Sequence, residues 1–175
     1  MASKPAYRFA RAALRYDETA RRIILPFKYG DRAEMAPNLA RLMARAGAAL
    51  LQTADLLVPV PLHPSRLRQR RYNQAALLTV SLARLAKKKV MLEALVRTRP
   101  TRKLEGMDAP ARREELDGAI SLKAGLDIQG RRILLIDDVM TTGTTAHQCA
   151  KTLCGDGALD VDVLTIARVE DPRLM

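Results

Sequence analysis

The spacing of hydrophobic residues changes several times along this 175-residue chain, and each change predicts a different element. Apolar positions at helical spacing predict helices over residues 17–25 and 35–51, with Gly47 tolerated inside the second. Between these helices, the Phe-Lys-Tyr-Gly-Asp stretch of residues 27–31 breaks the pattern and predicts a loop. The helical period returns over residues 72–88.

Continuous apolar runs predict strands that are buried on both faces, as in parallel sheets. One such run covers residues 55–61 and ends at prolines, which predicts a strand that enters a stiff loop. Further strands are predicted over residues 91–98, 132–138 and 161–167, with a helix over 144–153. This alternation predicts an α/β fold with a mostly parallel, doubly wound sheet and flanking helices.

No internal repeat or low-complexity linker interrupts the sequence, so we expect residues 1–175 to form a single domain. Residues 99–116 contain two prolines, a glycine and many charged side chains with little periodicity. Loops of that length are uncommon unless they are functional, so we expect a flexible loop over about residues 98–117.

The composition favours an aliphatic core and argues against membrane insertion. Hydrophobic residues make up 48% of the chain, but aromatic residues only 3%, and tryptophan is absent. The longest apolar runs are much shorter than the roughly 18 residues that span a bilayer. Cys149 and Cys154 are the only cysteines, which favours unpaired thiols in a reducing compartment. We therefore expect a cytoplasmic protein with no structural zinc, because two thiols cannot close a four-ligand site.

The formal net charge of +11 attracts polyanions, but charge alone does not identify them. Nucleic acid, a pyrophosphorylated sugar and an acidic partner all remain open. Aromatic residues that could stack on nucleic-acid bases are nearly missing from this sequence.

The strongest chemical signal lies at the end of the predicted strand over residues 132–138. Two acids, Asp137 and Asp138, are followed by a short loop that leads into the next predicted helix. A glycine in such a loop allows a tight turn, and a helix N-terminus offers unpaired amides to a phosphate. The acids suit the vicinal hydroxyls of a ribose and could help to orient a Mg²⁺ ion shared with pyrophosphate. The phosphate-binding part comprises Val139, Met140, Thr141, Thr142, Gly143, Thr144 and Thr145.

Two simpler interpretations apply to single residues of this motif. Asp138 could begin a turn, and Thr144 could cap the following helix. The succession of four apolar residues, two acids and a Thr-Thr-Gly-Thr-Thr loop favours the functional interpretation. The motif is not a Walker P-loop, because no Gly-Lys-Ser/Thr follows.

Residues 133–145 resemble the motif with which type I phosphoribosyltransferases bind 5-phosphoribosyl 1-pyrophosphate (PRPP). Residues 58–63 (Val-Pro-Val-Pro-Leu-His), 70–75 (Arg-Arg-Tyr-Asn-Gln-Ala) and 27–31 are similar to the ComF family of phosphoribosyltransferase-like proteins, which is linked to DNA uptake in competent bacteria. The matches cover about residues 16–169. The resemblance implies a type I phosphoribosyltransferase-like fold with a small hood.

The resemblance also assigns roles to individual residues. Asp137 and Asp138 would contact the ribose hydroxyls and Thr141 to Thr145 the 5′-phosphate. The pyrophosphate side would include the backbone amides of residues 60–63 and three basic side chains: Val60, Pro61, Leu62, His63, Lys28, Arg70 and Arg71. The flexible loop would supply Arg99, Arg102, Lys103 and Arg112. Asn73 and Gln74 could serve the site or cap the helix that starts there.

The sequence departs from the family pattern at three places. ComF proteins usually begin with a cysteine-rich zinc module, which is absent here, so the module is lost or the chain is shortened. In the loop, the family commonly has Gln near Leu104 and Asn near Glu115. These two departures bear on catalysis more than on PRPP binding.

Two functions follow from the resemblance. The first is a phosphoribosyltransferase that uses PRPP and its Mg²⁺ to modify an unknown nitrogen acceptor and releases pyrophosphate. The alternative is a non-catalytic accessory protein of DNA uptake or recombination, with single-stranded DNA or with competence or recombination proteins as partners. A homo-oligomer is compatible with either.

Overall fold

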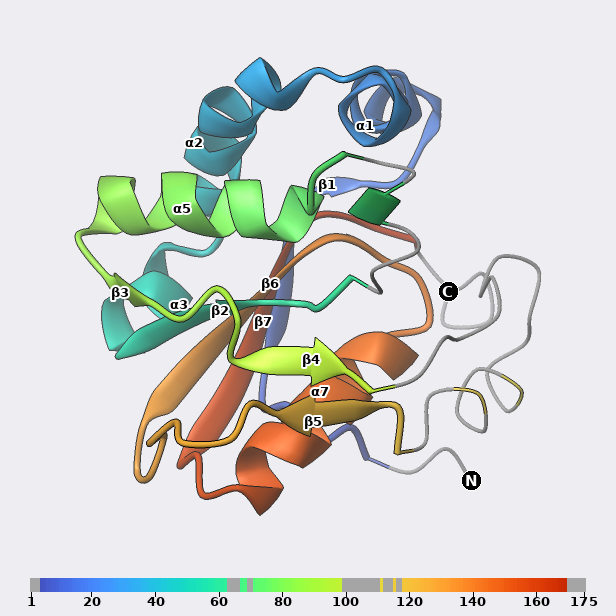
Figure 1. Ribbon diagram of the computed structural model, residues 1–175. Helices are drawn as coiled ribbons and strands as arrows, with labels where there is room; N and C mark the ends of the chain where they lie inside the picture. Colours follow the sequence, from blue (N-terminus) through green and yellow to red (C-terminus); the bar gives the residue numbers. More distant parts are fainter. Residues whose placement is uncertain are drawn as a thin grey trace.

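A computed structural model describes residues 4–62, 67–68, 71–98, 111, 115 and 118–169. Five strands form one sheet in the order β1-β7-β6-β2-β3, and every neighbouring pair is parallel (Figure 1). The predicted parallel sheet is therefore confirmed. In chain order the strands are β1 (Ala10–Arg15), β2 (Leu56–Pro59), β3 (Lys89–Val90), β6 (Arg132–Met140) and β7 (Asp160–Arg168).

Helices cover both faces of the sheet, as Figure 1 shows. One face packs against α1 (Glu18–Tyr29), α2 (Ala36–Ala46), α3 (Ala48–Thr53) and α5 (Gln74–Ala86). A short 3₁₀ turn, η1 (Ala33–Met35), joins α1 to α2. The other face packs against α7 (Thr144–Gly155) and an antiparallel ribbon of β4 (Leu95–Arg97) and β5 (Ile120–Leu122).

The central strand β6 is buried on both faces because it alternates between two hydrophobic clusters. Leu134 and Ile136 belong to the cluster under α1, α2 and α5, whereas Ile133 and Leu135 belong to the cluster under α7 and the ribbon. All four side chains are at most 1% exposed. Burying each contributes roughly 1.5–3 kcal/mol, so this aliphatic run anchors the sheet.

Helix α1 extends further than the sequence pattern predicts. The loop expected over residues 27–31 is wrong for Phe27, Lys28 and Tyr29, which form the last turn of α1. Phe27 is fully buried and lies against the ring of Tyr72, with 6.2 Å between the ring centroids. The helix continues to Tyr29 because this tertiary packing overrides the local breaks in the pattern.

The helix predicted over residues 35–51 is divided at Gly47 into α2 and α3. A Cβ atom added at Gly47 would lie 2.6 Å from the Leu164 side chain of β7.

Two strands were also missed, β1 and β5, and β3 lies where the lysine cluster predicted a helix end. These strands are short or partly polar, so their period is weak.

β1 is held at the edge of the sheet by a charged contact. Arg8 binds Asp162 through two nitrogens, at 3.2 and 2.8 Å, and Asp162 also accepts a hydrogen bond from the Phe9 amide.

Within the described part of the chain, no helix is long and apolar enough to span a bilayer.

The close approach of Gly47 to Leu164 makes a testable prediction. Gly47→Ala should lower the free energy of unfolding by about 1–3 kcal/mol, because the added Cβ overpacks the core. Gly155→Ala is the matched control, since nothing lies within 4 Å of its Cβ position. The control should be neutral or stabilising by up to about 1 kcal/mol. Denaturant unfolding of both variants measures the difference, and equal stabilities would contradict the packing described here.

Candidate functional site

The strand order places a ligand site at the carboxyl ends of β2 and β6. From β2 the chain passes through α5 to β3, at one edge of the sheet. From β6 the chain passes through α7, on the opposite face, to β7. This strand pairs with β6 on the side away from β2. The order of the strands therefore reverses between β2 and β6, which is where doubly wound sheets bind ligands.

The start of α7, after the loop that follows β6, has no side-chain cap among the described residues. Gly143 is the N-cap of α7 and has a φ of 74°, in the left-handed region that favours glycine. The prediction that Thr144 might cap this helix is wrong, because Thr144 is its first residue. The first bond within the helix runs from the His147 amide to the Gly143 carbonyl. The amides before it are unpaired helix donors, which bind phosphate groups well.

Hydroxyl groups surround this helix start. The Oγ1 atoms of Thr142 and Thr144 lie 2.8 Å apart, so they form a hydrogen bond. Thr141 and Thr142 are exposed, whereas Thr144 is buried and Thr145 is half-buried. The structure thus places Thr141 to Thr145 together at this helix start. Val139 and Met140, which were also expected to bind the phosphate, instead end strand β6 and pack against the two hydrophobic clusters.

The two acids lie at the end of β6 and are partly satisfied by the backbone. The Asp138 amide donates to Asp137 Oδ1 at 2.8 Å, and the Val139 amide donates to Asp138 Oδ1 at 2.6 Å. Asp138 Oδ2 is 3.2 Å from Lys28 Nζ. Asp138 is only 8% exposed, so this ion pair is shielded from solvent.

The surroundings of Asp137 favour its protonated form. Burial, reinforced by the negative charge of Asp138, raises the pKa of Asp137 to about 7. The positive charges of Lys28 and Arg97 oppose this rise. A carboxyl group that titrates near neutrality at the switch point of the sheet is typical of a functional site.

The Tyr-Asn-Gln motif positions Lys28. The last carbonyls of a helix have no hydrogen-bond partner within the helix. At the end of α1, side chains from outside the helix supply partners for two of them. Tyr72 donates its hydroxyl to the Phe27 carbonyl at 2.8 Å, and Gln74 donates Nε2 to the Lys28 carbonyl at 3.1 Å. These two contacts fix the end of α1, from which Lys28 reaches Asp138.

Asn73 has two structural roles. Its Oδ1 caps α5 by accepting the Ala75 and Ala76 amides, at 3.0 and 3.4 Å. Its Nδ2 donates to the Val60 carbonyl at 3.2 Å, which ties α5 to the segment after β2. The expectation of a helix cap is therefore confirmed for Asn73.

The segment after β2 offers fewer amides than the resemblance implied. The Val60 amide already donates to the Ile136 carbonyl at 2.9 Å, and Pro61 has no amide hydrogen. Val60 therefore cannot turn its amide to pyrophosphate while this sheet bond is intact. Leu62 is the first residue of the segment whose amide is not used by the sheet, and it is half-buried.

The remaining basic residues of the prediction are spread more widely. Arg71 is exposed, has a φ of 66° and pairs with Asp31 rather than with the acids of β6. Several residues lie outside the described ranges, and their roles stay predictions: His63, Arg70, Arg99, Arg102, Lys103 and Arg112.

Two residues near the site were missed by the sequence analysis. Arg97, at the end of β4, donates Nε to the Pro61 carbonyl at 3.0 Å. Strand alternation from the buried Leu95 could have indicated that Arg97 faces inward. Tyr7 had no local signal, yet its hydroxyl oxygen lies 2.8 Å from the Cβ position of Gly143.

Both cysteines lie in α7, after the acid pair and the loop before the helix. Burial raises the pKa of Cys149 to about 12, so its thiolate is scarce at neutral pH. Cys154 is exposed, and both thiols are free. The described residues contain no group of three or more His, Cys, Asp or Glu residues that could hold a metal ion.

Sequence comparisons identify the relatives of this chain, although no protein-family model matches it. DNA utilization protein YhgH of Escherichia coli K12 is 36% identical over 152 residues, which make up 83% of this chain and 66% of that protein. Competence protein F of Haemophilus influenzae is 33% identical over 159 residues, 87% of this chain and 69% of that protein. This chain belongs to the ComF family. It spans about two thirds of the length of these curated relatives.

Structural comparisons agree with the fold of this ComF chain. Glutamine PRPP amidotransferase from B. subtilis superimposes with a TM-score of 0.53 at 20% identity, over 79% of this chain and 30% of that one. Adenine phosphoribosyltransferase from Thermoanaerobacter pseudethanolicus superimposes with a TM-score of 0.52 at 14% identity, over 83% and 86% of the two chains. At these identities the likeness establishes the type I phosphoribosyltransferase fold alone.

The raised pKa of Asp137 predicts how stability depends on pH. Between about pH 4 and 7 the folded ComF chain holds a proton on Asp137 that the unfolded chain releases, so stability falls as pH rises through this window. Asp137→Asn should remove this cost and raise the free energy of unfolding at pH 8 by at least about 1 kcal/mol relative to pH 5.

Denaturant unfolding at both pH values tests this prediction. Asp127→Asn is the matched control, because it removes an exposed carboxylate and keeps an oxygen that can accept the Gln129 amide. A gain at pH 8 that is equal in the two variants would contradict the raised pKa of Asp137.

The two roles of Asn73 can be separated by substitution. Asn73→Ala should lower the free energy of unfolding by about 1–3 kcal/mol, because it removes both the cap of α5 and the bond to Val60. Asn73→Asp keeps an acceptor for the cap but loses the donor, so it should cost less than Asn73→Ala. Thermal or denaturant unfolding provides the measurement. An Asp variant as stable as wild type would show that the Val60 contact contributes nothing.

Proposed function

We propose that this chain binds PRPP, together with the Mg²⁺ that PRPP carries, at the carboxyl ends of β2 and β6. One observation carries the proposal: an acid pair and a helix start with a glycine N-cap, Gly143 at φ 74°, follow one another at the switch point of the sheet. Each element suits a different part of one ligand, a ribose with a phosphate on one side and a pyrophosphate on the other.

In this proposal the 5′-phosphate binds at the start of α7. The amides of residues 143–146 donate to its oxygens, and the hydroxyls of Thr141, Thr142 and Thr145 add further donors. The dipole of a 12-residue helix favours negative charge at this end. Gly143 allows the turn at a φ of 74° and the close approach of Tyr7, whose hydroxyl oxygen lies 2.8 Å from the Cβ position of Gly143.

The ribose and pyrophosphate then lie toward β2. The 2′- and 3′-hydroxyls donate to Asp137 and Asp138, while the pyrophosphate lies between Leu62 and Lys28. Mg²⁺ in nucleotide-type sites is held largely by substrate phosphates and water. The ion would arrive bound to the oxygens of PRPP.

The reaction that fits this ligand is phosphoribosyl transfer. The bond between C1 of the ribose and the pyrophosphate oxygen breaks, and the electron pair leaves with pyrophosphate. A nitrogen of the acceptor donates its lone pair to C1 and afterwards loses a proton to water. Lys28 and Arg97 supply positive charge beside the departing group, the form of catalysis that preorganised charges provide. We assign this function to the cytoplasm, because both cysteines are unpaired.

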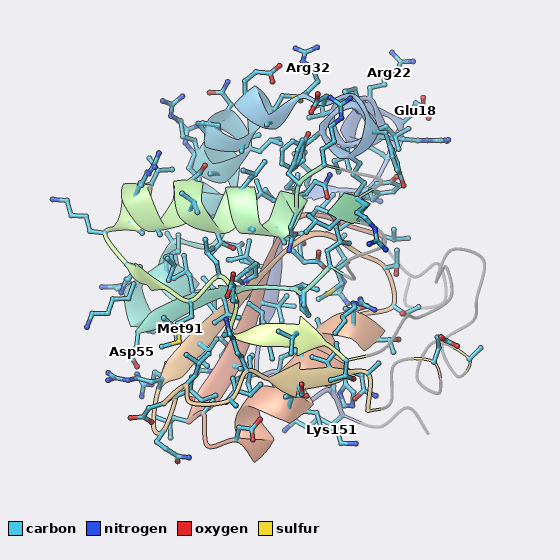
Figure 2. All side chains as sticks on the ribbon, in the orientation of Figure 1. Glu18, Arg22, Arg32, Asp55, Met91 and Lys151 are labelled. Carbon is cyan, nitrogen blue, oxygen red and sulfur yellow. The ribbon has the colours of Figure 1, made fainter. Side chains whose placement is uncertain are left out.

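A second candidate function is a non-catalytic role in DNA use, which is favoured by the names of the relatives and by a basic surface. Arg22 and Arg32 project outward from the helical layer above the sheet (Figure 2). The exposed basic residues in this part of the structure include Arg21, Arg22, Arg32, Arg41, Arg45, Arg84 and Lys87. Such a surface attracts the phosphate backbone of single-stranded DNA without reading its sequence.

PRPP binding is tested by a thermal shift with PRPP and with ribose 5-phosphate, each with and without Mg²⁺. We expect the largest shift with PRPP and Mg²⁺, because only this pair occupies the whole site. A melting temperature that millimolar PRPP with Mg²⁺ leaves unchanged would contradict the proposal.

Substitutions then locate the ligand. The double variant Asp137→Asn with Asp138→Asn should weaken PRPP roughly tenfold or more, since each lost bond to a charged group costs about 1.5–3 kcal/mol. Gly143→Val should abolish binding of PRPP and ribose 5-phosphate alike. Asp127→Asn with Asp156→Asn is the matched control, because both acids are exposed. Calorimetric titration measures the affinities, and wild-type PRPP affinity in either correctly folded site variant would refute this placement.

Two measurements separate the candidate functions. Release of pyrophosphate from PRPP with a panel of bases and amines would favour phosphoribosyl transfer. Binding to single-stranded DNA whose affinity falls steeply with salt would favour the accessory role, with a slope of about −0.7 per neutralised phosphate.

A further inference from the structure

Arg97 lies on the inner face of the β4–β5 ribbon, next to the site. It is the last residue of β4, and it pairs with Ile120 of β5. Side chains two residues apart on a strand share a face, and Leu95, two residues earlier, is only 4% exposed. Arg97 is itself half-buried, so the ribbon directs a guanidinium group inward at the carboxyl end of the sheet.

The side chain of Arg97 links the ribbon to the segment after β2. Its Nε donates to the Pro61 carbonyl at 3.0 Å, across 36 residues of sequence. Pro61 is buried and stands directly before Leu62, which the proposed function places beside pyrophosphate. A guanidinium group has five donors in a rigid plane, so one arginine can hold a carbonyl and still present charge to a neighbouring group.

That neighbouring group is the acid pair. The positive charge of Arg97 lowers the pKa of Asp137, against the stronger effects of burial and of Asp138. Lys28 contacts Asp138 from α1, on the opposite face of the sheet. Among the described residues, a cation therefore acts on the acids from each face of the five-stranded sheet, Lys28 from α1 and Arg97 from β4.

We propose that Arg97 is a positioning residue for the pyrophosphate half of PRPP: it fixes the Pro61–Leu62 segment to the ribbon and places positive charge beside the acid pair. This inference rests on the proposed function. It goes beyond that function because it names the residue, Arg97 of β4, that makes the site prefer PRPP to ribose 5-phosphate. Because Arg97 is distant in sequence from both the acid motif and the segment after β2, neither motif indicates its role.

The test compares three variants with three ligands. Arg97→Gln removes the charge, and Arg97→Lys keeps a charge but loses the forked geometry. Arg131→Gln is the matched control, because Arg131 is exposed and lies beside the first residue of β6, at the other end of the strand from the acids. Calorimetric titration is carried out with PRPP, ribose 5-phosphate and inorganic pyrophosphate, all with Mg²⁺.

We expect Arg97→Gln to weaken PRPP and pyrophosphate about tenfold and ribose 5-phosphate less than threefold, the size expected for one bond to a charged group. Arg97→Lys should lie between wild type and Arg97→Gln for PRPP, and Arg131→Gln should match wild type. A loss of packing would instead lower the affinity for all three ligands together.

The outcomes separate this inference from the proposed function. If wild-type protein binds PRPP and Arg97→Gln binds PRPP and pyrophosphate equally well, the role of Arg97 is refuted and the proposed function stands. An equal loss of affinity for ribose 5-phosphate and PRPP would also refute it. If Arg97→Gln does not fold, the same comparison is decided by Arg97→Lys. Wild-type protein that binds none of the three ligands would contradict the proposed function, and the inference with it.

Discussion

The burial of β6 on both faces is the constraint on which the rest of this structure depends. Four apolar residues, Ile133 to Ile136, fill the two halves of the core, and the strand then ends in two acids. The same burial that stabilises the sheet removes water from Asp137 and Asp138. Carboxylates in such a place need compensation, because an unpaired buried charge is costly.

The compensation comes from elements on both sides of the sheet. Lys28 reaches Asp138 from α1, whose end is fixed by Tyr72 and Gln74. Arg97 approaches Asp137 from β4 and also holds the Pro61 carbonyl. These two cations are the ones that the proposed function places beside pyrophosphate. This gives a physical reason for the motifs of the ComF family to be scattered along the chain yet act together.

Sequence patterns predicted the parts of the fold that depend on strong periodicity. The continuous apolar run of β6 and the acids after it were recognised because a strand buried on both faces leaves a distinctive pattern. The edge strand β1 was missed because its position depends on the distant contact between Arg8 and Asp162. The predictions of where α1 ends and of an unbroken helix through Gly47 were wrong for the same reason. Tertiary packing against Tyr72 and Leu164 decides both features.

For the candidate site, the sequence predicted the loop between β6 and α7 better than the residues around it. Thr141 to Thr145 are contiguous, so one motif contains them. Arg97 and Tyr7 meet this loop and the acids only through the folded chain, and no local pattern marks them. The Asn73 and Gln74 pair left two interpretations open, and the structure assigns both residues to holding backbone groups in place.

The central claim is that PRPP lies across the acids of β6 and the start of α7. A crystal structure of the protein soaked with PRPP and Mg²⁺ tests it most directly. The account predicts a 5′-phosphate within hydrogen-bond distance of the amides of residues 143–146, and ribose hydroxyls against Asp137 and Asp138. PRPP bound elsewhere, or a site that stays empty at millimolar PRPP and Mg²⁺, would contradict it.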